Sequence, residues 1–129
     1  MNKILVEVSV GELLDKISIL EIKKEKIKDL ESLKFIEKEY LILKEQLDKN
    51  IKQNDKLDEL FQSLKKINMT LWAMEDEKRS YEKNSDFGNK FIKVSRDIHF
   101  LNDDRSKVKL EINKLTGSLI REIKQYTSY

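Results

Sequence analysis

Apolar residues recur in alternating steps of three and four along most of the chain, which is the spacing of one helix face. The clearest run consists of Phe87, Phe91, Val94, Ile98, Leu101, Arg105, Val108, Ile112 and Leu115. Only Arg105 interrupts its apolar character. Similar runs predict helices over about residues 9–30, 32–50, 55–83 and 86–116. Heptad spacing in four helices with short links predicts a mainly α fold, an antiparallel four-helix bundle built from long helical hairpins.

Polar residues before the apolar runs mark where the helices should begin. Ser9 and Glu12 fit a capping box, in which the hydroxyl and the carboxylate satisfy free backbone N–H groups. Asp55 is the predicted N-cap of the third helix, and either Ser85 or Asp86 that of the fourth.

The segments outside the helices have a different pattern. Residues 3–8 are β-branched and apolar without a helical period, and predict a short strand. Gly117 should end the fourth helix in a left-handed conformation, and residues 118–126 are a second candidate strand. The two strands could pair as a ribbon, which would be stable only when packed on the helices. We expect residues 1–129 to form a single domain.

Composition narrows the chemistry. The 129 residues include no cysteine, no proline, three glycines and one histidine, His99. Without cysteine there are no disulfides or thiolate metal sites, and one histidine does not make a histidine-rich site, so we expect no metal and no cofactor. No run of about 18 apolar residues predicts a membrane span. The start of the chain lacks the features of a signal peptide, so we expect a cytoplasmic protein.

The charges are nearly balanced, with 26 basic and 24 acidic residues. They interleave along every segment, which is typical of solvated helix faces with ion pairs between successive turns. Nucleic-acid binders usually carry a clustered basic excess. Nucleic-acid binding is therefore only a second alternative for this chain.

Arginine is rare among the basic residues. It occurs at positions 79, 96, 105 and 121, and the other 22 basic residues are lysines. Arg105 occupies a seam position, where a buried guanidinium needs a carboxylate or an anionic ligand. The acidic residues that could pair with it are Asp15, Glu21, Glu75, Asp76 and Asp104. The sequence does not choose among them. It also leaves open whether Arg105 fixes the helix register or forms an anion site with Lys24, Lys78 or Arg79.

Other polar residues lie near the seams. The candidate anion-binding or buried ion-pair residues are Arg79, Arg96, Arg105, Asn102, Asp103 and Asp76. The spacing of Glu75 and Asp76 to Arg79 favours intrahelical salt bridges over a metal site. His99 with Asp103 is too common a pairing to indicate catalysis, so we predict no catalytic residues. Trp72 widens the apolar stripe of the third helix and is a candidate interface residue.

Three stretches carry a resemblance to a known family. They are residues 8–23 (VSVGELLDKISILEIK), residues 71–82 around Trp72, and a stretch from residue 91 that continues through Thr116, Gly117 and Ser118 to Lys124 and Tyr126. They resemble an uncharacterised family of short bacterial proteins, a domain of unknown function, which implies no mechanism. Residues 14–20 are also faintly similar to the first helix of the all-helical chorismate mutases, which bind a dicarboxylate among Arg and Lys side chains. This chain departs from that pattern because its first helix has only lysine at the basic positions.

These observations favour a non-enzymatic protein-interaction or oligomerisation module. Long, thin hairpins expose apolar flanks, so we expect a homodimer with coiled-coil-like seams, and a protein partner is a further option. The alternative is a small-anion or metabolite-binding bundle, with or without enzymatic activity, that uses Arg79, Arg96 and Arg105.

Overall fold

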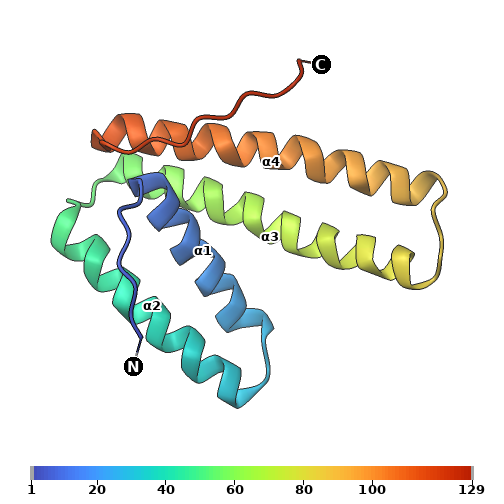
Figure 1. Ribbon diagram of the computed structural model, residues 1–129, viewed down its shortest axis with the longest axis horizontal. Coiled ribbons are helices and arrows are strands. Elements are labelled where there is room, and N and C mark those ends of the chain that lie inside the picture. Colours follow the sequence, from blue (N-terminus) through green and yellow to red (C-terminus); the bar gives the residue numbers. More distant parts are fainter. Residues whose placement is uncertain (1, 129) are drawn as a thin grey trace.

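The structure is a computed structural model in which residues 2–128 are described. It consists of four helices, α1 (Val10–Lys26), α2 (Leu30–Asn50), α3 (Asp55–Lys83) and α4 (Asn89–Thr116). The helices form two antiparallel hairpins, α1–α2 and α3–α4 (Figure 1). The mainly α helical-bundle fold predicted from the heptads is confirmed. None of the described helices is both long and apolar enough to cross a membrane.

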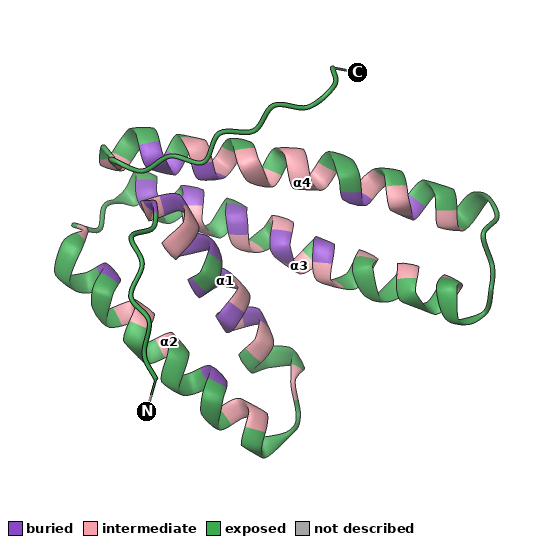
Figure 2. Cartoon of the chain, in the orientation of Figure 1, coloured by how far each residue is buried: buried purple, intermediate pink, exposed green. Residues whose placement is uncertain are grey.

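Helix α1 is the centre of the packing. It contacts α3 and α4 where α3 begins and α4 ends, whereas α2 packs mainly against α1 and places Leu47 in the shared core (Figure 1). The main core joins Leu14 and Ile17 of α1 to Leu57 and Leu64 of α3 and to Ile112 of α4. Burying each of these side chains contributes on the order of 2 kcal/mol. The buried residues accordingly gather where α1 meets the other hairpin (Figure 2).

The far half of the α3–α4 hairpin has a smaller core of its own. Leu71 faces Val94 and Ile98 there, and only α3 and α4 contribute to it. Most of this end is exposed (Figure 2). The α3–α4 hairpin therefore extends beyond α1, and a wedge-shaped space lies between α1 and the far half of this hairpin.

The helix ends agree with the predictions in part. Ser9 Oγ accepts the backbone N–H of Glu12, as predicted, but the Glu12 carboxylate binds Lys109 and does not close the capping box. Asn54, not Asp55, caps α3. Gly88 precedes α4 without a side-chain cap hydrogen bond, so the cap predicted at Ser85 or Asp86 is wrong.

Two helices are also shorter than expected. Helix α1 stops at Lys26, and Asp29 then caps α2 through the N–H of Ser32. Helix α4 begins at Asn89 after a turn in which Asp86 accepts the N–H of Gly88. The observed helix ends therefore lie a few residues from the predicted ones, because local capping contacts determine where each helix begins.

The predicted strands do not form. Residues 3–8 and 118–126 are free of strand structure in the described chain. In Figure 1 the first segment leads from the start of α1 toward the bottom of the view and the second leads from the end of α4 toward the top, so they diverge. The C-terminal segment is held by the helices, since Ser118 Oγ accepts the N–H of Val10.

Candidate functional site

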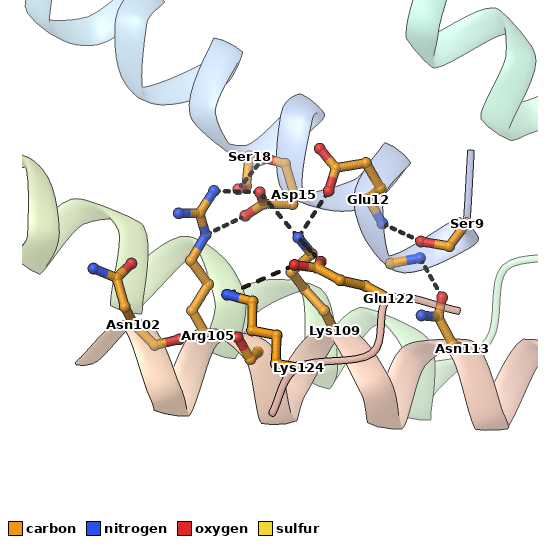
Figure 3. Close-up of polar contacts among 12 residues, drawn as sticks. Ser9, Glu12, Asp15, Ser18, Asn102, Arg105, Lys109, Asn113, Glu122 and Lys124 are labelled. Atoms are coloured by element: carbon orange, nitrogen blue, oxygen red, sulfur yellow. Dashed lines mark hydrogen bonds and ion pairs between the residues drawn. The ribbon is translucent and has the colours of Figure 1, made fainter. Parts of the chain in front are cut away.

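A buried carboxylate lies where α1 crosses the α3–α4 hairpin. Asp15 is only 1% exposed. Its Oδ1 accepts Arg105 Nε at 3.0 Å and its Oδ2 accepts Arg105 Nη2 (Figure 3). Oδ1 also accepts Asn68 Nδ2 at 2.9 Å. Two parallel bonds from one guanidinium are the strongest common form of a carboxylate pair. Asp15 is therefore the partner of Arg105 among the five acidic residues that the sequence left as candidates.

Asn68 and Ser18 complete the polar surroundings of this pair. Asn68 Nδ2 also donates to Ser18 Oγ at 2.8 Å, and Ser18 Oγ donates to the backbone oxygen of Asp15 at 2.7 Å. Both residues are buried. Within residues 2–128, no buried side-chain nitrogen or oxygen lacks a partner. The desolvation cost of burying these groups is therefore offset by hydrogen bonds.

The Asp15–Arg105 contact also affects proton affinity. The hydrogen bond to Asp15 raises the pKa of Arg105 above its ordinary value, against the effect of partial burial. The guanidinium is therefore charged at neutral pH.

Lys109 is a second cation at the same junction. Its Nζ donates to Glu12 at 2.7 Å and to Glu122 at 2.8 Å, and lies 3.9 Å from Asp15 Oδ2 (Figure 3). Burial lowers the pKa of Lys109, but the hydrogen bonds to Glu12 and Glu122 and the negative charges of Asp15 and Glu12 together raise it above its ordinary value. The bond to Lys109 in turn lowers the pKa of Glu122. Lys109 thus ties the start of α1 and the C-terminal segment to α4.

Gly11 allows α1 to approach α4 closely. Its N–H donates to Asn113 Oδ1 at 2.7 Å. A Cβ atom at this position would lie 2.6 Å from the backbone oxygen of Lys109, closer than side chains tolerate. Asp15 lies one helical turn later on the same face. The missing side chain of Gly11 therefore brings Asp15 within reach of Arg105.

A cleft opens beside this polar junction, in the wedge between α1 and the far half of the hairpin. Its volume is about 390 Å³. Its lining residues are Ile19, Ile22, Asn68, Leu71, Trp72, Glu75, Asp76, Arg79, Asn102 and Arg105. The surface is thus apolar at α1, Leu71 and Trp72, with charged and amide groups around it. No cluster of three or more His, Asp or Glu side chains suited to a metal ion occurs in the described part of the chain.

The fold brings most of the predicted site residues together. Besides Arg105, the cleft is lined by Asn102, Arg79, Asp76 and Trp72. Whether they form a site stays a prediction.

Two of the predicted residues lie elsewhere. Arg96 is exposed beside Asp97 and Phe100 on another part of α4. Asp103 lines a separate hollow of about 280 Å³ that also includes Lys109 and Glu122. Neither residue lines the cleft.

The salt bridges expected within α3 are absent. Among the described residues, Arg79 makes no ion pair with Glu75 or Asp76, and all three side chains are exposed. Exposed pairs of this kind contribute little, because water and side-chain entropy compete with them. Their charges are therefore available to a bound molecule.

Several residues of the junction were not predicted. Asn68, Lys109, Asn113 and Glu122 were not among the candidates. Gly11 carried a sequence signal, as one of three glycines in the chain and one of two, with Gly88, within the first turn of a predicted helix. The other four look like ordinary solvated helix or tail residues until the helices are packed.

Comparison with known families gives one result. Residues 4–129 match the model of the Family of unknown function (DUF6165). No curated protein matches the chain, and no solved structure does. The comparisons thus give no support to the likeness to chorismate mutases. Since the family model covers nearly all of the sequence, the chain belongs to the family of unknown function DUF6165.

Proposed function

We propose that this protein binds a small polar metabolite in the cleft between α1, α3 and α4. One observation carries the proposal, the way in which Arg105 is held. Nε and Nη2 bind the buried Asp15, while Nη1 points away from that carboxylate (Figure 3). Arg105 also lines the cleft. The buried partner therefore fixes a guanidinium whose remaining N–H groups can bind a ligand.

The surroundings of Arg105 suit such a role. A guanidinium held by two hydrogen bonds loses little further freedom when it binds a third group. Ile19, Ile22, Leu71 and Trp72 provide apolar surface, and Asn102 provides an amide one turn before Arg105. Ligand sites are commonly clefts of roughly 300–1,000 Å³ with apolar walls and a few polar groups. This cleft has both properties.

Trp72 provides a direct test, because it is the only tryptophan in the chain and lines the cleft. We expect a screen of carboxylates, amino acids, sugar phosphates and nucleotides to find a compound that shifts the indole N–H resonance of Trp72. The same compound should raise the melting temperature, since a ligand that binds only the folded state stabilises it.

Variants locate the binding. Asn102→Leu, which puts an apolar side chain into the cleft, should abolish the shift. Gln62→Leu is the matched control, because Gln62 is exposed on α3 and does not line the cleft. The proposal is wrong if no compound moves the Trp72 signal, or if the Asn102→Leu variant responds like the unmodified protein.

A second function, homodimerisation, is favoured by the N-terminal segment. Ile4, Leu5 and Val6 are 86%, 83% and 73% exposed, and residues 3–8 have no strand partner within the described chain. Such a β-branched apolar run with free backbone groups can pair with the same run of a second copy. We propose that two chains associate through this segment.

The oligomeric state tests this second proposal. Light scattering during size exclusion should give the mass of a dimer at micromolar concentrations. Replacing both Ile4 and Val6 by Asp should give a monomer, because the charges would face each other across the paired strands. Leu119→Asp, at a fully exposed position of the other terminal segment, should remain dimeric. A monomeric unmodified protein would contradict the proposal.

A further inference from the structure

The charges around the cleft are arranged in order along α3. Asn68 lies at the inner end, next to Asp15, and is followed by Trp72, by Glu75 with Asp76, and by Arg79. A helix rises about 1.5 Å per residue, so Asn68 and Glu75 are roughly 10 Å apart along the axis. The cleft therefore has two ends with different chemistry.

The inner end offers hydrogen-bond donors. Arg105 and Asn68 bind the same carboxylate, which places Arg105 at this end. Two of the five N–H groups of Arg105 bind Asp15, and its Nη1 is directed away from Asp15 (Figure 3). Asn102 adds an amide. A carboxylate can accept hydrogen bonds from a guanidinium and from an adjacent amide at once.

The outer end carries a negative excess. Glu75 and Asp76 are exposed and form no ion pair among the described residues, and Arg79 balances only one of their charges. Ionised carboxylates can only accept hydrogen bonds, so they fit an ammonium group. At the inner end, Asp15 already balances the charge of Arg105. The cleft as a whole thus has no positive excess with which to bind a purely anionic molecule.

On the basis of the proposed function, we infer that the ligand is dipolar, with a carboxylate at one end, an ammonium group at the other and an apolar chain between them. The carboxylate binds Arg105 and Asn102, the apolar chain lies over Leu71 and Trp72, and the ammonium group binds Glu75 and Asp76. The separation of the two ends favours an ω-amino acid over an α-amino acid, whose charges are adjacent.

Three probes of equal chain length test this inference. They are 6-aminohexanoate, hexanoate and hexylamine, each titrated while the indole N–H resonance of Trp72 is recorded. We expect half-saturation with 6-aminohexanoate at a concentration at least about tenfold lower than with either singly charged probe, which corresponds to about 1.4 kcal/mol. The shorter 4-aminobutanoate should bind more weakly than 6-aminohexanoate, because it does not reach both ends.

Paired variants identify the ammonium end. Glu75→Gln with Asp76→Asn should remove the preference for 6-aminohexanoate over hexanoate. Asp58→Asn with Glu59→Gln is the matched control, an adjacent acidic pair on the same helix that is exposed and does not line the cleft. The control should keep the preference.

The outcomes separate the two proposals. If hexanoate binds as tightly as 6-aminohexanoate, the dipolar ligand is wrong and a binding cleft remains. The same holds if 6-aminohexanoate has no effect while another compound of the screen shifts Trp72. If nothing shifts Trp72, the binding function fails and the dipolar ligand fails with it. Equal losses in the Glu75/Asp76 variant and in its control would also overturn the assignment of the ammonium end.

Discussion

Replacing Arg105 by methionine should lower the free energy of unfolding by about 3 kcal/mol, because it leaves Asp15 buried without its bidentate partner. Asp15 is 1% exposed, and Lys109 is 3.9 Å from its Oδ2 and bound to two other carboxylates. The remaining cation is therefore poorly placed to compensate. Urea unfolding should show a lower midpoint with an unchanged slope.

A double-mutant cycle separates the loss of the pair from the burial of a lone charge. Adding Asp15→Asn to Arg105→Met removes the uncompensated charge and keeps a side-chain oxygen for Asn68. The double variant should recover at least half of the lost stability, and the cycle gives the coupling energy. Lys93→Met is the control, because the Lys93–Asp97 pair is exposed on the same helix, and it should change stability by less than about 0.5 kcal/mol. An Arg105→Met variant as stable as the unmodified protein would contradict the structural role of the pair.

Replacing Gly11 by alanine should cost about 2 kcal/mol, although alanine favours helices more than glycine does. The new Cβ would lie 2.6 Å from the backbone oxygen of Lys109 and 3.0 Å from Asn113 Oδ1. A backbone atom inside α4 cannot move aside as a side chain can, so α1 must shift outward. We expect a lower melting temperature and a changed environment of Trp72 in the fluorescence spectrum.

Gly88→Ala is the natural comparison. Its Cβ would meet only the side-chain oxygen of Asp86, at 3.4 Å. The loss should stay below about 1 kcal/mol, the range of changes at a helix N-cap. If the two glycine variants were equally stable, the close approach of α1 to α4 would not matter for the fold.

Periodicity was enough to predict the helices because helix formation depends on residues close in sequence. The seam position of Arg105 was enough to predict that it needs a partner. The choice of Asp15 was not predictable, because it depends on how α1 lies across two helices at once, which heptad spacing within each helix does not encode.

The burial of Lys109 shows a second limit. In the sequence it resembles its neighbours Lys107 and Lys114, which are exposed. It becomes buried only because α1 and the C-terminal segment both cover it, bringing Glu12 and Glu122 to its Nζ. The terminal segments were misread for a related reason, since β-propensity predicts an extended chain but not which surface it will contact.

The position of α2, which packs mainly against α1, has a practical consequence. No residue of α2 lines the cleft, and the turn at residues 27–29 forms the tip of the α1–α2 hairpin farthest from α3 and α4 (Figure 1). Exposed turns between helices tolerate insertions well. This tip is therefore the attachment point for a fluorophore or a fused domain that leaves the cleft and both terminal segments untouched.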